Sequence, residues 1–479
     1  MNKEPKIVTF AGEIFQEMEK STLVRLIRSF SSVELRDVRK FLHSPFFNQR
    51  QDLIDLFEQL AGSDEPQKED LRRYLSPPTA PLDDQKLRLL MSYLHGLLEQ
   101  YVAIKEMTAD KMKVQLQLAT GYRKRRMNEA FERVRKNLEK NLKAQPLRNL
   151  TYHDCHYQLQ WEAHQLNYVQ NPTDISRLHD LSGMADVVYL AQKLRLICLL
   201  AAHQTIYQSG ITSSPDEGII MNAEQEPFVT LPVVAVWLHC YRMLQHPAEE
   251  AHFQQFKEIL LEQSECFSEE EIHGLYILAI NYCVRRLNAG DERFYREAFD
   301  LYKAGLGKGY LFVEGMLSRF TYHNIVATGL RLGELDWVRY FISEYKNRLE
   351  KTYRESAFSY NLARLEYESG HYGFVLELLQ KANYRDPLLN LAAKTLLLKT
   401  YHDLGEHDLL QSHLDAMRNY IHRKRVIGYH RTNYLNIIRF AEKIMRLNML
   451  DKKAVEALLQ TVEQEEVLTE KAFFLKVLE

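Results

Sequence analysis

The sequence predicts an all-α protein, an α-solenoid of paired helices preceded by an N-terminal helical bundle. Apolar residues recur at spacings of three and four through most of the chain, which is the period of helices with one buried face. Glycine and proline are scarce, at 19 and 13 of 479 residues, and no alternating β-branched run is bounded by turn pairs. We therefore expect no β-sheet between residues 270 and 420.

The first expected domain, residues 1–108, has the start signals and apolar faces of a small helical bundle. Ser31 precedes an apolar-periodic run, and Glu34 stands three residues later, which is the spacing of a capping box. Asp83 or Asp84 caps a long helix further on. The apolar positions expected to form the core of this bundle include Leu35, Val38, Phe41, Leu42, Leu53, Leu56, Phe57, Leu60, Leu71, Leu87, Leu90, Leu94, Leu97, Leu98, Tyr101 and Ile104.

The next region, residues 109–208, is expected to be helical and contains the strongest charge feature of the chain. Between residues 111 and 143, eleven Lys or Arg residues stand against three Glu, a local charge of +8. One interpretation is a solvated helix face, since basic runs are common on helices. The alternative is a phosphate-binding surface for RNA or DNA. The candidate nucleic-acid residues are Arg123, Lys124, Arg125 and Arg126.

An acidic stretch, residues 209–230, separates this region from the C-terminal part of the chain. It contains several Gly and Pro residues and four acids, with no Lys or Arg. Such composition favours a long irregular loop, which in a folded chain is either functional or an insertion. We expect helices to resume at Leu231 and to continue as a repeat domain over residues 231–479.

The stretch Ser356–Pro387 predicts two antiparallel helices. An apolar face ends at Gly370, because a helix C-terminus often needs the positive φ that glycine adopts readily. A second apolar face follows, and Asp386-Pro387 is expected to end it. Two short helices cannot bury both faces alone, so such a unit has to stack on others like it.

This stretch resembles a tetratricopeptide repeat, with two departures. Ser359 stands where the family prefers tryptophan, and Tyr367 lies one residue later than the family pattern places its aromatic residue. The resemblance covers roughly residues 270–465 and implies a right-handed superhelix whose groove is lined by the first helix of each pair. The positions that match the family pattern are Leu362, Ala363, Tyr367, Val375, Leu379, Ala382 and Pro387.

Internal repetition supports the resemblance. An Asn with a Gly nine residues later occurs three times, and a fourth copy keeps the Gly but has Leu396 in place of the Asn. A weaker fifth pair turns near Asn448. The glycines are separated by 43, 37 and 35 residues, which is typical of a degenerate natural array. The repeated pairs are Asn281 with Gly290, Asn324 with Gly333, and Asn361 with Gly370.

Other classes of protein are disfavoured by composition and motif. The net charge of −2 gives no global attraction to nucleic acid or membrane, and no stretch is apolar enough to span a bilayer. Five isolated cysteines fit reduced thiols in a cytoplasmic protein. His153 and His156 share a helical spacing but lack further ligands, so we expect no metal and no cofactor. No nucleotide-binding, hydrolase or kinase motif is present, and we expect no catalytic residues.

These observations favour a non-catalytic scaffold or adaptor that binds a protein or peptide of unknown identity. In tetratricopeptide proteins that bind peptides, asparagines on the groove-lining helix contact the peptide backbone, which suits the donor and acceptor of an amide side chain. Asparagines that bond within the helix pair are the alternative. The candidate groove residues are Asn281, Asn324, Asn361, Tyr360, Arg364 and Lys399. The alternative function is a nucleic-acid-binding or partner-sensing regulator using residues 111–143, a layout that resembles bacterial regulators with repeat-type sensor domains.

Overall fold

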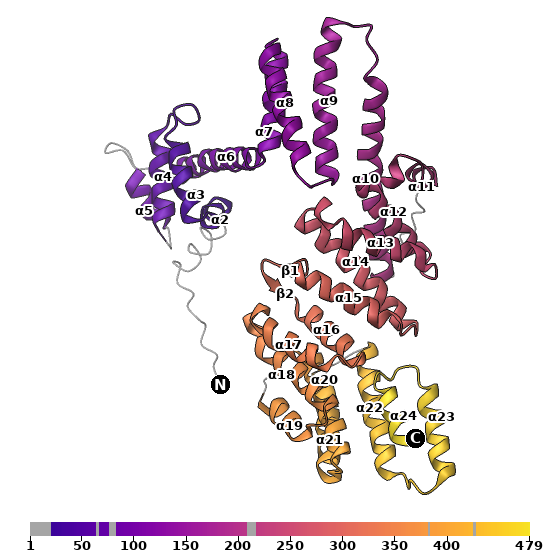
Figure 1. Cartoon of the computed structure of the whole chain (residues 1–479). Helices are drawn as coiled ribbons and strands as arrows, with labels where there is room; N and C mark the ends of the chain where they lie inside the picture. The colour runs from indigo at the N-terminus through magenta and orange to yellow at the C-terminus, as the bar shows by residue number, and fades with distance from the viewer. Residues whose placement is uncertain (1–20, 64–66, 76–82, 208–216, 382–383, 425–427) are drawn as a thin grey trace. The chain divides into compact units, whose positions relative to one another are not determined.

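The computed structural model describes residues 21–63, 67–75, 83–207, 217–381, 384–424 and 428–479, and these residues are almost entirely helical (Figure 1). They divide into two compact units, residues up to 145 with 151–185, and residues 146–150 with 186–479. This division differs from the four segments expected from the sequence. The long helix α6 ends at Ala109, and α7 begins at Lys111 after the single cap residue Asp110. Residue 108 is therefore not a boundary between compact units.

The first unit contains the N-terminal bundle and a group of longer helices. The expected capping box is present, since the Ser31 hydroxyl accepts from the Glu34 amide while the Glu34 carboxylate accepts from the Ser31 amide. Asp83 caps α6 by accepting from the Lys86 amide at 2.7 Å. The bundle core matches the expected apolar positions at Val38, Leu56, Phe57, Leu94 and Leu98, all fully buried. The helices are α2 (Thr22–Ser29), α3 (Ser32–Leu42), α4 (Gln51–Gly62), α5 (Lys68–Leu75), α6 (Asp84–Ala109), α7 (Lys111–Lys124), α8 (Asn128–Ala144), α9 (Leu150–Gln170) and the beginning of α10 (Leu178–Tyr207).

Within this unit, α7, α8 and α9 pack around two clusters of buried apolar side chains. The chain reverses between α7 and α8 at Arg126, which has a φ of 58°. The buried residues come from all three helices: Leu116, Ala119, Phe131, Val134, Leu138, Leu142, Cys155, Leu159 and Ala163. Phe131, Val134, Leu138 and Leu142, spaced three and four residues apart on α8, are therefore buried, while Met127 just before the helix is exposed.

The second unit is a succession of helices in which neighbours along the chain pack together. Large aromatic side chains, among them Tyr276, Tyr322, Phe299 and Phe341, are fully buried between them. The helices are the rest of α10, then α11 (Glu217–Ala223), α12 (Pro232–Gln245), α13 (Glu250–Glu262), α14 (Glu269–Asn288), α15 (Phe294–Gly307), α16 (Arg319–Arg331), α17 (Leu335–Tyr345), α18 (Lys351–Glu368), α19 (Tyr372–Lys381), α20 (Pro387–Asp403), α21 (His407–Arg423), α22 (Gly428–Arg446), α23 (Lys452–Gln464) and α24 (Lys471–Leu478).

Glycines in the left-handed region lie between the expected helix pairs. Gly290, Gly333, Gly370 and Gly405 have φ values of 90°, 73°, 77° and 71°. They separate α14 from α15, α16 from α17, α18 from α19 and α20 from α21. The prediction that these four glycines are the turns of helix pairs is confirmed.

Polar contacts connect each of these turns to the next one. At each junction, an acidic side chain near one turn accepts a hydrogen bond from a side chain of the neighbouring pair. These contacts occur at successive junctions between α13 and α20. Packing between first helices accompanies these contacts, since α12 packs on α14, α16 on α18 and α18 on α20. The contacts are Arg293 with Glu250 at 2.5 Å, Arg331 with Glu292 at 2.6 Å, Arg296 with Glu334 at 2.9 Å, Arg339 with Glu366 at 2.5 Å, and Tyr367 with Asp403 at 2.6 Å.

The expectation of no β-structure between residues 270 and 420 is wrong at one point. The link between α15 and α16 forms a small antiparallel hairpin, β1 (Phe312–Val313) and β2 (Met316–Leu317). Its two turn residues, Glu314 and Gly315, have φ values of 50° and 75°, the conformation that suits two-residue hairpin loops. Strands of two residues are too short to show an alternating pattern in the sequence. The hairpin lies between two expected helix pairs, so it replaces no helix of either pair.

Two further boundaries differ from the sequence expectation. The stretch 209–230 is not wholly irregular, because residues 217–223 form α11 and Phe228–Thr230 form a short 3-10 turn, while residues 209–216 lie outside the described part. Asp386 does not end a helix but begins one. Its carboxylate caps α20 by accepting from the amides of Leu388 and Leu389 at 2.9 and 3.0 Å.

Candidate functional site

The three repeated asparagines occupy the same position on the first helices α14, α16 and α18, nine residues before each turn glycine. Their surroundings differ, however. Asn281 and Asn324 are exposed, whereas Asn361 has 0% of its surface exposed. The three amides are therefore not equivalent, although their helices and positions are.

Asn361 lies between two neighbouring helices. Its Nδ2 donates to the Ala357 carbonyl at 2.8 Å and lies 2.7 Å from Nδ1 of His323 on α16. Its Oδ1 is buried and has no hydrogen-bond partner within the described residues. Burial lowers the pKa of His323 to about 4, so this imidazole is neutral near pH 7. The contacts of Asn361 connect α18 to α16.

The other groove candidates near Asn361 make contacts of their own. The Arg364 guanidinium lies 5.8 Å from the centre of the Tyr360 ring, within the range of a cation–π interaction. Lys399, expected to contact an anion, has its Nζ 3.1 Å from the Glu470 carboxylate, and its side chain is 17% exposed. The anion that Lys399 contacts is thus a carboxylate of this chain.

A pocket of about 280 Å³ opens beside Asn281 in the second unit. Its walls are mainly apolar, and its polar groups are the Asn281 and Asn288 amides and the Arg285 guanidinium. Most of the lining comes from α14, with one residue each from α10 and α12. The lining residues are Ala202, Leu244, Leu278, Asn281, Tyr282, Val284, Arg285 and Asn288.

Arg285 is the charged group of this pocket. Its Nη2 lies 3.4 Å from the Met243 carbonyl, and its guanidinium lies 5.6 Å from the centre of the Tyr282 ring. Its Nε is buried without a hydrogen-bond partner, and no carboxylate forms an ion pair with it, within the described residues. Burial lowers the pKa of Arg285, although an arginine stays charged in this range. The arrangement can accept a carboxylate together with an extended backbone.

Sequence reasoning did not identify Arg285. It lies one helical turn after Asn281, where the other two copies have Thr328 and Leu365. A search for what repeats along the chain passes over a residue that occurs in one copy only. The available signal was a charged residue at a position where the other two copies have buried side chains.

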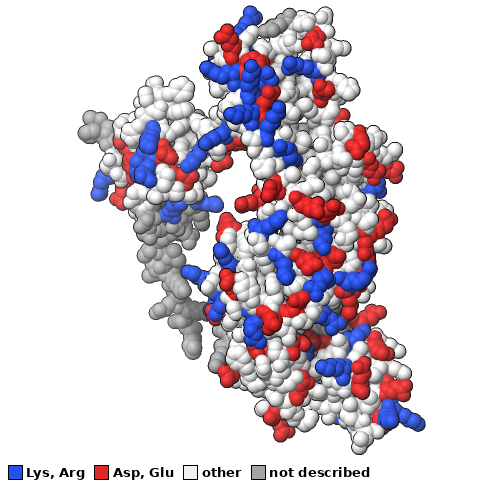
Figure 2. Space-filling view, in the orientation of Figure 1, with Lys and Arg blue, Asp and Glu red and all other residues white. Residues whose placement is uncertain are grey.

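The four basic candidates of the first unit lie at the end of α7 and in the turn that follows. Arg123 is engaged by Glu162 of α9 at 2.5 Å, and Arg125 donates to the Gly121 carbonyl at 3.0 Å. Lys124 and Arg126 are exposed. Blue side chains gather over α7 and α8 in Figure 2. The sequence of α8 itself contains five Lys or Arg residues.

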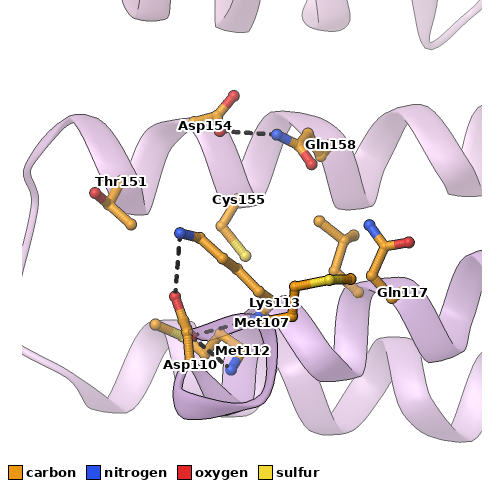
Figure 3. A pocket seen from close by; sticks show the side chains of 10 residues that line it. Met107, Asp110, Met112, Lys113, Gln117, Thr151, Asp154, Cys155 and Gln158 are labelled. Atoms are coloured by element: carbon orange, nitrogen blue, oxygen red, sulfur yellow. Dashed lines mark hydrogen bonds and ion pairs between the residues drawn. The ribbon is translucent and has the colours of Figure 1, made fainter. Parts of the chain in front are cut away.

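A second pocket, of about 290 Å³, lies in the first unit between α6, α7 and α9 (Figure 3). Burial raises the pKa of the Cys155 thiol on its wall to about 11, so this thiol is protonated near pH 7 and is a poor nucleophile. Its carboxylates are engaged: Asp110 accepts from the amides of Met112 and Lys113, and Asp154 accepts from Gln158 at 2.7 Å. Asp110 thus caps the N-terminus of α7, and the Asp154–Gln158 bond lies within α9.

The remaining candidates concern metals and membranes. His153 and His156 both lie on α9, and burial lowers the pKa of His156. No group of three or more His, Cys, Asp or Glu side chains with metal-binding geometry occurs among the described residues. In the same part of the chain, no helix combines the length and apolar character needed to cross a bilayer.

The comparisons with known proteins add no relative. No family model matches the chain, no curated protein is detectably similar to it in sequence, and no solved structure matches its fold.

Proposed function

We propose that this protein is a non-catalytic adaptor whose tetratricopeptide-like helix pairs stack as a solenoid and bind a segment of another protein. The observation that carries the proposal is the succession of helix pairs with left-handed glycine turns, joined from one turn to the next by polar contacts. Such pairs bury their apolar faces only against neighbours, and stacking them creates an extended surface lined by first helices.

The binding site we propose is the pocket of Asn281, Arg285 and Asn288. A guanidinium held against an aromatic ring and lacking an acidic partner attracts a carboxylate, because bidentate guanidinium–carboxylate pairing is strong where water is partly excluded. The two amides offer donors and acceptors to an extended backbone, and the apolar wall formed by Leu244 and Leu278 suits an aliphatic or aromatic side chain. The ligand would therefore be a peptide with a carboxylate next to an apolar residue.

A peptide library with free C-terminal carboxylates, compared with the same library amidated, tests this site on the full chain. We expect the wild-type protein to retain carboxylate peptides more strongly, and Arg285→Gln to weaken retention by about 1.5–3 kcal/mol, the range for hydrogen bonds to charged groups. Arg331→Gln is the matched control, since Arg331 lies on a neighbouring first helix and pairs with Glu292 at the turn edge.

Three results would count against the proposal. Equal retention of the two libraries would exclude the carboxylate. Retention unchanged by Arg285→Gln would exclude the pocket. Loss in both variants would indicate a general effect of charge. Circular dichroism of each variant shows whether helix content is kept.

A further inference from the structure

We propose that the exposed face of α8 is a nucleic-acid-binding surface that contacts the phosphodiester backbone. The residues that carry this inference are not the four basic residues at the end of α7 but a stripe of four cations along α8. We call it the α8 stripe, formed by Arg133, Lys136, Lys140 and Lys143.

The α8 stripe lies opposite the buried side of its helix. At 3.6 residues per turn, spacings of three, four and three place its four side chains on one face. The buried side chains Phe131, Val134, Leu138 and Leu142 follow the same kind of spacing and fall on the other face. All four cations of the stripe are exposed, so the core of the first unit fixes their direction toward solvent.

The cations of the α8 stripe form no ion pairs with the described residues. No ion pair or side-chain hydrogen bond of these four residues occurs within the described ranges. The neighbouring acids Glu132 and Glu139 both contact Arg135, at 2.8 and 2.6 Å, and neither forms an ion pair with the stripe. Glu129 lies on this face one turn before Arg133, and Glu132 and Glu139 lie at its edge. In the second unit, by contrast, arginines at the helix turns pair with acids of the next pair.

The dimensions of the α8 stripe fit a phosphate backbone. A rise of 1.5 Å per residue separates its first and last cations by about 15 Å. One strand of a duplex presents a phosphate about every 3.4 Å along the axis, so about four phosphates lie within that length. Lys124 and Arg126 are exposed at the turn that precedes α8 and add two cations before its N-terminal end.

A membrane surface fits the α8 stripe less well. Basic helices that lie on membranes insert an apolar face next to their charged face. The apolar face of α8 is buried against α7 and α9, with Phe131 and Leu138 fully enclosed. No large apolar side chain of α8 is exposed, and Met127 lies just before the helix, so charge alone would act, as it does in sequence-independent nucleic-acid binding.

The test measures binding of the full chain to random-sequence DNA and RNA, each as duplex and as single strand, across a salt series. With four phosphate contacts on a duplex we expect log K to fall against log salt with a slope of about −3.6, which is about a 150-fold loss between 50 and 200 mM. The form bound most tightly identifies the preferred nucleic acid.

The key variant replaces Arg133, Lys136, Lys140 and Lys143 together with Gln, which keeps good helix propensity. Its binding at low salt should fall at least about tenfold, with a slope near zero. The matched control replaces four exposed lysines of the second unit with Gln, giving the same change in net charge and, we expect, unchanged binding. Those lysines are Lys351, Lys452, Lys453 and Lys476.

Several outcomes would overturn the proposal. The inference fails if the wild-type protein binds no nucleic acid at low salt, or if the α8 variant binds as the wild type does. It fails equally if the control variant loses as much affinity as the α8 variant. Vesicles containing phosphatidylserine form a further arm, and binding to them with none to nucleic acid would assign the stripe to a membrane instead. If the α8 variant loses helix content, Lys140→Gln with Lys143→Gln repeats the comparison.

Discussion

Substitution of Gly329 by Ala gives the sharpest test of how α16 packs on α17. A Cβ built at Gly329 would overlap Cγ2 of Val338 and would lie 3.2 Å from the Phe299 ring. Alanine gains about 1 kcal/mol of helix propensity over glycine, but overpacking a fully enclosed contact costs about 1–3 kcal/mol or more. Because the overlap with Val338 is severe, we take the upper end and expect a net loss of about 2 kcal/mol in the free energy of unfolding.

Gly274→Ala is the matched control for this prediction. Gly274 also lies inside a first helix, α14, but its added Cβ would meet no atom within 4 Å. Only the propensity term then remains, so this variant should be up to about 1 kcal/mol more stable than the wild type. Two glycines in comparable helices should thus respond with opposite signs.

The assay is urea unfolding followed by tryptophan fluorescence, combined with hydrogen exchange of α16 and α17. Trp337 is a local reporter, since its ring stacks on Phe341 with centroids 5.5 Å apart, next to Val338. In a Val338→Ala background the overlap disappears, and Gly329→Ala should cost nothing further. A stable single variant, or effects that add within about 0.5 kcal/mol, would refute the close approach of the two helices.

Two other predictions concern the turns. Arg339→Ala should lower the free energy of unfolding by about 1–3 kcal/mol, because the buried Glu366 carboxylate loses its main partner. The loss should be smaller than the about 3–5 kcal/mol of a fully buried pair, since the Arg339 side chain is 47% exposed. Burial alone would raise the pKa of Glu366, but hydrogen bonds from Arg339 and His371 outweigh it and keep this pKa below its usual range. The stability that the ionised Glu366 contributes is therefore fully present above the unfolded pKa of about 4.3, and it is lost as pH falls through the lower pKa of the folded state. The cost of Arg339→Ala should accordingly shrink on acidification, and a cost that grows toward low pH would contradict it. Gly370→Ala should cost about 1 kcal/mol because its φ is 77°, whereas Gly373→Ala, three residues on in open space, should not destabilise; thermal melts that rank the two the other way would disprove the turn argument.

Local signals made part of the fold predictable. A left-handed turn needs glycine whatever surrounds it, so Gly290, Gly333, Gly370 and Gly405 could be placed from sequence. The capping box at Ser31 is equally local. Core positions such as Leu94 and Leu98 followed from the helical period alone.

Features that depend on contacts between elements were not predictable in this way. The repeat shows that Asn281, Asn324 and Asn361 share a position, but not that His323 of the neighbouring helix encloses only Asn361. Arg285 became a candidate only when α10 and α12 were seen to wall its pocket. The basic cluster drew attention to Arg123, whose charge is matched by a carboxylate that lies 39 residues away in sequence.

The polar contacts between successive turns should also respond to salt. Within a pair, helices are held by buried apolar side chains, which salt does not weaken. Between pairs, part of the attraction comes from exposed pairs such as Arg331 with Glu292 and Arg296 with Glu334, and charges at the surface are screened within about 8 Å at physiological salt. The Arg339–Glu366 contact, with its carboxylate enclosed, is screened much less. Rising ionic strength should therefore weaken the polar contacts at the junction of α14–α15 with α16–α17 more than the Arg339–Glu366 contact at the next junction.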